Sequence, residues 1–311
     1  MSASPSQNVV EKLSLHGILP AHNILSQFDA GLITAPSTKG DLLKAWTASS
    51  TAYAARLAAE GNLQSGDVSP MPTSLAAKTT ALLGQIRNYP PFDSHKTELA
   101  QVMVSRLVTP QLTVTLPRLQ QRAPIGQATT QDELFRVMFE VGSSPQPVFR
   151  QTLGLAPNGG ALLYTSYDED VRLHHPPFFR RLPINDADPA SPSHEAICLP
   201  VGGGLPFAYA FRVQVGPGIQ RVILANGIHR VAAAAIAGIR SVPLILTDFA
   251  ALEVPDPFVE TPKQLLLDPN VRPPMIEDFA DSGLTMQLKF FRMLKTVRFN
   301  WTFENYVVPV R

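Results

Sequence analysis

Proline limits what this chain can fold into more than any other residue type. The sequence has 29 prolines in 311 residues, close to twice the usual ~5%. Because proline lacks a backbone N–H and clashes with the preceding helical turn, it is excluded from helix interiors and central strands. Ten of the prolines fall within residues 143–206. We therefore expect long ordered connections there, built around short strands such as 161–165.

The remaining composition indicates a folded protein with few surface charges. Hydrophobic residues make up 45% of the chain, charged residues 16%, and the net charge is +1. This balance excludes extensive disorder, and it disfavours a nucleic-acid partner because such domains are usually strongly basic. Many prolines and few charges instead favour a surface covered by a protein partner or a second copy. Cys198 is the only cysteine, so an intramolecular disulfide is excluded.

The first residues contain neither a basic nor an apolar segment of the kind found in signal peptides. No apolar run reaches the ~20 residues that a membrane-spanning helix needs. We expect a cytoplasmic protein with no membrane partner.

Residues 1–120 are expected to form a mainly helical region. An alanine-rich run over 39–60 ends at Gly61, where a helix-terminating glycine belongs. Ser74 precedes a second candidate helix over 75–86, and a third segment, 96–108, is closed by Pro110. Residues 112–116 alternate with period two, which favours a short strand or an extended arm.

Residues 121–311 are expected to form a mixed αβ domain, which makes the fold class α/β in the broad α+β sense. Thr130 and Glu133 have the spacing of a capping box at the start of a helix over 131–141. Near the end of the chain, 285–294 is predicted to be a basic helix.

The clearest structural unit lies at 206–250. Apolar strands are predicted over 207–215, 221–225 and 242–246, with a glycine turn at 216–218 and a helix over 229–237 that ends at Gly238. Strand, turn, helix and strand in this order form a compact αβ unit whose strands can share one sheet.

The turn at Asn226-Gly227-Ile228-His229-Arg230 carries the strongest chemical signal in the chain. A glycine between a strand and a helix allows a sharp turn, and the following helix directs free N–H groups at the turn, which favours an anion. Arg230 can bind a phosphate with two hydrogen bonds, and His229 can donate a hydrogen bond or transfer a proton. The alternative is an ordinary turn before a core helix, with His229 capping the helix and Arg230 on the surface.

This run resembles the signature of the ParB/sulfiredoxin superfamily, over about residues 220–250 only. The signature is Asp/Asn-Gly-x-His-Arg, an alanine-rich helix, a glycine, and Val/Ile-Pro opening a strand. The matching residues are Asn226, Gly227, His229, Arg230, Ala233, Gly238, Val242 and Pro243. The resemblance implies that Gly227, His229 and Arg230 bind the phosphates of a nucleotide such as ATP, ADP or CTP. With Asn226 and Ile228 they make up the candidate binding loop.

Departures from the superfamily narrow the expected chemistry. Sulfiredoxins carry a reactive cysteine in this loop, whereas this chain has Ile228, so we do not expect sulfinic-acid reduction. Chromosome-partitioning members have an arginine-rich box and a helix-turn-helix after the fold, and neither is recognisable beyond residue 250. Free-serine kinases of the superfamily use a carboxylate base, for which Asp168, Glu169 and Asp170 are candidates here.

Those carboxylates stand close to a histidine pair, His174 and His175. Carboxylates and imidazoles are suitable metal ligands, but adjacent histidines in a strand point to opposite faces, and the alternative is a solvated acidic loop. If the carboxylates are functional, Asp168 or Glu169 supplies a base or a Mg²⁺ ligand to a nucleotide at the 226–230 loop. His229 is a third catalytic candidate.

Two functions from different classes follow. In the first, the chain binds a small phosphorylated ligand, as a phosphotransferase or a nucleotide hydrolase. In the second, it is a non-catalytic assembly protein that keeps the fold within a larger complex.

Overall fold

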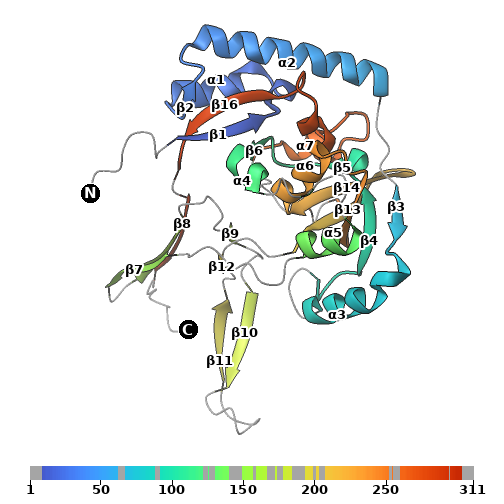
Figure 1. Ribbon diagram of the computed structural model, residues 1–311. Helices are drawn as coiled ribbons and strands as arrows, with labels where there is room; N and C mark the ends of the chain where they lie inside the picture. The colour runs from blue at the N-terminus through green and yellow to red at the C-terminus, as the bar shows by residue number, and fades with distance from the viewer. Residues whose placement is uncertain are drawn as a thin grey trace. The chain divides into compact units, whose positions relative to one another are not determined.

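The computed structural model describes residues 9–61, 67–87, 92–121, 125, 130–139, 149–156, 159–166, 172–173, 178–183, 193–198, 201–202, 207–251, 254, 260–293 and 295–302. The chain forms two compact units (Figure 1). The first unit combines Met1–Ser143 with Pro206–Arg292, and the second combines Ser144–Leu205 with Met293–Arg311.

The first unit contains both helices and strands, which places the fold in the α+β class. Its helices are α1 (Ala21–Asp29), α2 (Lys39–Glu60), α3 (Ala76–Ile86), α4 (Leu116–Gln121), α5 (Gln131–Met138), α6 (Ile228–Ile236) and α7 (Lys263–Leu267). Its strands are β1 (Val9–Ser14), β2 (Ile33–Ala35), β3 (Val68–Pro70), β4 (Thr97–Met103), β5 (Leu107–Val108), β6 (Thr113–Thr115), β13 (Tyr209–Gly216), β14 (Ile219–Asn226), β15 (Ser241–Phe249) and β16 (Met286–Phe291). Short 3₁₀ helices include η2 (His16–Ile18), η4 (Val104–Arg106) and η5 (Ile276–Ala280).

A six-stranded mixed sheet organises this unit, in the order β3-β4-β15-β13-β14-β5. β13 and β14 are joined by the expected glycine turn and pair antiparallel, whereas β13 and β15 pair parallel. The prediction that the strands around the 226–230 turn share one sheet is therefore confirmed.

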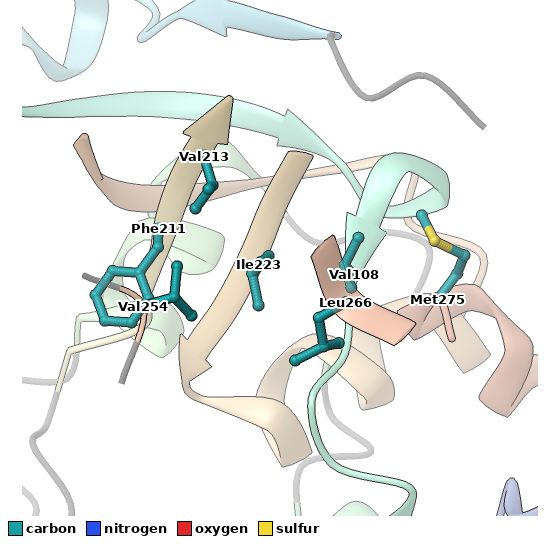
Figure 2. Close-up of a cluster of buried hydrophobic side chains, with 7 residues drawn as sticks. All are labelled: Val108, Phe211, Val213, Ile223, Val254, Leu266 and Met275. Carbon is teal, nitrogen blue, oxygen red and sulfur yellow. The ribbon is translucent and has the colours of Figure 1, made fainter. Parts of the chain in front are cut away.

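One face of this sheet carries a buried apolar cluster (Figure 2). Alternate residues of β13 and β14 point to the same face, and Phe211, Val213 and Ile223 are all at most 4% exposed. They pack with side chains from β5, α7 and the segments beside them: Val108, Val254, Leu266 and Met275. The cluster fixes the two strands that lead into and lie beside the 226–230 turn.

The second sheet of the unit has the order β2-β16-β1-β6. Its buried face packs on α1 and α2 through Ile24, Ile33, Leu42, Met286, Leu288 and Phe290. The prediction of a helix over 285–294 was wrong, because these residues include the strand β16. Met286, Leu288 and Phe290 are buried while the residues between them are exposed, which is the period of a half-buried strand.

The helix expected over 96–108 was also wrong, because this segment forms β4, η4 and β5. β4 pairs with β15 from Ser241↔Met103 to Thr247↔Thr97. Leu99, Ala100 and Val102 are all buried, so the strand is covered on both faces. Such a strand has no alternation to separate it from a buried helix segment.

Other local predictions are confirmed. α2 ends at Gly61, whose φ is 62°, and Thr130 and Glu133 form the full capping box that starts α5. The boundary expected at residue 120 differs from the observed units, because β4 pairs with β15 and β1 pairs with β16. The region before residue 120 is thus folded together with the far part of the chain.

The described elements of the second unit are strands. They are β7 (Phe149–Ala156), β8 (Gly159–Ser166), β9 (Arg172–Leu173), β10 (Phe178–Pro183), β11 (Ser193–Cys198), β12 (Val201–Gly202) and β17 (Lys295–Thr302). β17, β8 and β7 form one sheet, and β10 pairs with β11. The strand expected over 161–165 lies inside β8. Among the described helices of the whole chain, none is long and apolar enough to cross a membrane.

A buried histidine lies beneath α1. His16 is 3% exposed, with Nδ1 2.8 Å from Ser14 Oγ and Nε2 3.1 Å from the Gln27 side-chain amide nitrogen. Since that amide nitrogen can only donate, Nε2 accepts and the ring is neutral with its proton on Nδ1. Burial, helped by the nearby positive charge of Lys12, lowers the pKa of His16 from 6.5 to about 4.

This histidine predicts a specific loss of stability in mild acid. In the unfolded chain His16 takes up a proton near pH 6.5, whereas in the folded chain it stays neutral until about pH 4. The stability that the fold gains from keeping His16 neutral is therefore complete above pH 6.5 and is lost as the pH falls towards 4. Between those values we expect the free energy of unfolding to fall by ~1.4 kcal/mol per pH unit from this group. Denaturant titrations at several pH values measure it.

The matched variants are His16→Gln and His22→Gln, the second at an exposed histidine of α1. His16→Gln should flatten the acid slope of the unfolding free energy, and His22→Gln should leave it as in the wild type. Equal slopes in all three proteins would contradict the account.

Candidate functional site

Gly227 forms the corner between β14 and α6. It is the N-cap of α6 in the left-handed region, with φ 94° and ψ 18°, and its carbonyl accepts from the N–H groups of Arg230 and Val231, both at 3.0 Å. A Cβ added here would lie 2.8 Å from the Cβ of Ala208 and 3.1 Å from its Cα. Glycine is required at this position both for its positive φ and for the space it leaves to Ala208.

Asn226 is buried at the end of β14, at 7% exposed. Its side-chain amide donates a hydrogen bond to the carbonyl of Phe207, just before β13. The side chain thus ties the turn to the neighbouring strand. A ligand that approaches the turn would meet backbone groups here rather than the Asn226 amide.

Arg230 lies in the first turn of α6 and is half-buried. Its Nη1 donates to the carbonyls of Met138 at 2.9 Å and Val137 at 3.3 Å, at the C-terminal end of α5, where a cation is favoured by the helix dipole. The carbonyl of Met138 also accepts from the N–H of Ala208 at 2.8 Å. Arg230 Nη2 lies 3.5 Å from the point where a Gly227 Cβ would stand, so the guanidinium is held beside the corner.

His229 points to a different neighbour. Its Nε2 accepts a hydrogen bond from the backbone N–H of Thr115 at 3.0 Å, at the junction of β6 and α4. Because a ring nitrogen that accepts cannot carry the proton, the neutral ring has its proton on Nδ1. Any proton that His229 exchanges with a ligand therefore passes through Nδ1.

Ile228 offers only its backbone to the turn. Its side chain is 6% exposed and belongs to the buried face of α6 together with Val231, Ala232, Ala233 and Ala234. The structure therefore brings the five residues of the candidate loop together at one corner, with the Arg230 side chain beside the glycine.

The candidate carboxylates Asp168, Glu169 and Asp170 lie outside the described residues, as do His174 and His175. All five belong to the second unit. Within the described part of the chain, no group of three or more His, Cys, Asp or Glu side chains is placed to hold a metal ion. The expected roles of Asp168 and Glu169 as base or Mg²⁺ ligand stay predictions.

Sequence reasoning missed the partners of the loop. Thr115, Met138 and Ala208 come from three separate segments, and two of them contribute only a backbone N–H or carbonyl. The amino-acid type of a residue does not predict that its backbone N–H or carbonyl will form such a bond. The small side chain of Ala208 is the single partner whose identity matters, because it leaves room for the close approach at Gly227.

Gly227→Ala tests the corner directly. We expect it to lower the free energy of unfolding by more than the ~1–2 kcal/mol that a left-handed backbone costs a residue with a side chain, because the new methyl also collides with Ala208. Gly238→Ala is the matched control, since Gly238 has φ 77° but open space around its Cβ position. Denaturant unfolding followed by tryptophan fluorescence measures both.

Ala208→Gly should recover part of the loss when combined with Gly227→Ala, because it removes the methyl at 2.8 Å. If Gly227→Ala and Gly238→Ala cost the same, or the double variant recovers nothing, the close approach does not limit the turn.

Comparisons with protein-family models, with curated proteins and with solved structures found no match to this chain.

Proposed function

We propose that the Asn226–Arg230 corner binds the phosphate group of a small phosphorylated ligand, with a nucleotide such as ATP, ADP or CTP as the ligand class. The observation that carries the proposal is the Arg230 guanidinium held beside Gly227 at the N-terminus of α6. Its Nη1 is oriented by the carbonyls of Val137 and Met138. Its Nη2 lies 3.5 Å from the position that a Cβ at residue 227 would take.

Three physical terms support phosphate at this corner. The N-terminus of α6 carries a partial positive charge and directs N–H groups outward. The left-handed backbone of Gly227 lets β14 turn directly into α6, so that the N–H groups of the first helical turn lie at the corner. A guanidinium that is already oriented loses less side-chain entropy when it binds a phosphate oxygen. The resemblance to the ParB/sulfiredoxin superfamily, in which this loop binds nucleotide phosphates, points to the same ligand and to a related fold for 206–250.

The reaction that follows binding is a phosphoryl transfer or a nucleotide hydrolysis, with Mg²⁺ as the metal that accompanies such phosphates. His229 would act through Nδ1. Asp168 and Glu169 are the candidate carboxylates on the sequence evidence alone.

A second function has its own supporting observation. Asn226, His229 and Arg230 each bond to a backbone group of another element, and a junction needs no more than this to be stable. In an assembly protein the corner would serve only to hold α5, β6 and β13 around α6, and the chain would bind no nucleotide.

Ligand-dependent unfolding separates the two functions. Millimolar ATP, ADP, CTP and GTP, each with and without Mg²⁺, are added to the full chain. A nucleotide present at about a hundredfold excess over its Kd should add ~2.7 kcal/mol to the free energy of unfolding. A flat response to all four nucleotides would favour the assembly protein.

Arg230→Gln locates the effect. The variant should lose most of the nucleotide response, and it should also be ~1–3 kcal/mol less stable because the carbonyls of Val137 and Met138 lose a charged donor. The informative quantity is therefore the shift that the nucleotide causes within each variant. Arg87→Gln, at an exposed arginine after α3, is the control that should respond like the wild type. An unchanged response in Arg230→Gln would place the ligand elsewhere.

A further inference from the structure

The backbone N–H of Thr115 decides what His229 can do at the Gly227 corner. It donates to His229 Nε2 at 3.0 Å, from the strand β6 at the edge of its sheet. Successive residues of an antiparallel strand direct their backbone groups to opposite edges. Leu15 of the neighbouring chain segment donates to the carbonyl of Leu112, so residues 112 and 114 face β1 and the Thr115 N–H faces the outer edge.

This contact fixes the protonation state of His229. A peptide N–H can only donate, so Nε2 is unprotonated and the neutral ring carries its proton on Nδ1. A second proton would have to go on Nε2, and it would break the bond to Thr115. While the ring is in contact with Thr115, His229 can therefore donate a hydrogen bond to a ligand but cannot take a proton from it.

The charges around the ring favour the same neutral state. The elements packed on α6, together with β6 and its neighbour β1, carry these ionisable residues: Lys12, Arg118, Asp132, Glu133, Arg136, Glu260, Glu277 and Asp278. Each carboxylate of this set accepts a hydrogen bond from a residue other than His229. Arg230, the next residue along α6, and the positive end of the helix dipole both disfavour a further positive charge on His229.

Nδ1 is also the ring nitrogen closer to the helix. It is bonded to the ring carbon that joins Cβ, so it stays near the backbone of the first turn, and side chains on a helix lean towards its N-terminus. The protonated nitrogen of His229 is therefore on the side of the ring nearest to the start of α6, where a phosphate is favoured.

We propose that the Thr115 N–H is a positioning group of the phosphate corner, which holds His229 as a neutral imidazole whose Nδ1–H donates to a phosphate oxygen. The inference rests on the proposed phosphate site and adds to it the role of His229. His229 belongs to ligand binding and is not the general base, so the base of a phosphoryl transfer or a hydrolysis comes from another residue.

Thr115→Pro and Thr115→Val separate the N–H of Thr115 from its side chain. Proline is accepted in an edge strand where the N–H points away from the ladder, so Thr115→Pro removes the donor to His229, whereas Thr115→Val keeps it. Nitrogen-15 magnetic resonance of the full chain without ligand, at pH 7.5, reports which ring nitrogen carries the proton. We expect Nδ1 in the wild type and in Thr115→Val, and loss of this preference in Thr115→Pro. A wild-type ring protonated on Nε2, or the same ring state in all three proteins, overturns the positioning role whether or not a nucleotide binds.

Two substitutions of His229 test the donor itself. Asparagine places an amide nitrogen near the Nδ1 position, whereas glutamine places its amide near Nε2 and leaves the Nδ1 position empty. In calorimetric titrations of the full chain with ADP, His229→Gln and Thr115→Pro should weaken binding about tenfold or more, as the loss of a hydrogen bond to a charged group does. His229→Asn should stay within ~threefold of the wild type, and Thr115→Val should bind like the wild type.

The pH dependence of the same titrations distinguishes a neutral donor from an imidazolium. If an imidazolium bound the phosphate, the affinity of the wild type relative to His229→Asn would rise by up to ~tenfold per pH unit as the pH falls. A neutral donor keeps the ratio of the two Kd values constant from pH 8 to pH 6.5. A ratio that rises towards acid pH, or an equal Kd in the wild type and His229→Gln, overturns the donor role and leaves the phosphate site in place. Absence of ADP binding by the wild type contradicts the phosphate site itself, and the donor role with it.

Discussion

The close approach of Gly227 to Ala208 is the constraint around which the first unit is arranged. A side chain at residue 227 would stand 2.8 Å from the Ala208 methyl, so only glycine lets β14 end beside the start of β13 and turn directly into α6. The carbonyl of Met138 then accepts from both Ala208 and Arg230. Three segments that are far apart in the sequence meet at one backbone oxygen.

The same arrangement gives α6 a cation beside each end. At its N-terminus, Arg230 is held by carbonyls at the C-terminal end of α5. The dipole of α5 favours a positive charge there, and the dipole of α6 favours an anion beside its own first turn. At its C-terminus, the turn through Gly238 leads to Arg240, at the edge of a cleft in which Arg56 pairs with both Glu277 and Asp281. The alanine-rich helix between them is buried at Ile228 and over 231–234, so it is a fixed support for both groups.

The sequence predicts those parts of the fold that depend on local chemistry. Gly61, the Thr130–Glu133 capping box and the elements of 206–250 are each specified by neighbouring residues, and they are observed. The predictions of helices over 96–108 and 285–294 were wrong because the secondary structure of these segments is decided by pairing with β15 and β1, which are far away in the chain. The candidate corner was found from its motif, but its bonds to Thr115, Val137 and Met138 could not be, since backbone groups are present at every residue and carry no signal in the sequence.

The most direct test of the phosphate site is a nuclear magnetic resonance titration of the chain with ADP, in which the amide signals of Gly227 and Ile228 and the guanidinium signals of Arg230 are followed. The account predicts saturable shifts at these three residues, with smaller shifts at Met138, and none at Arg240. If the signals of the corner stay unchanged while ADP binds elsewhere, or if ADP does not bind at all, the corner is a structural junction and the phosphate site is contradicted.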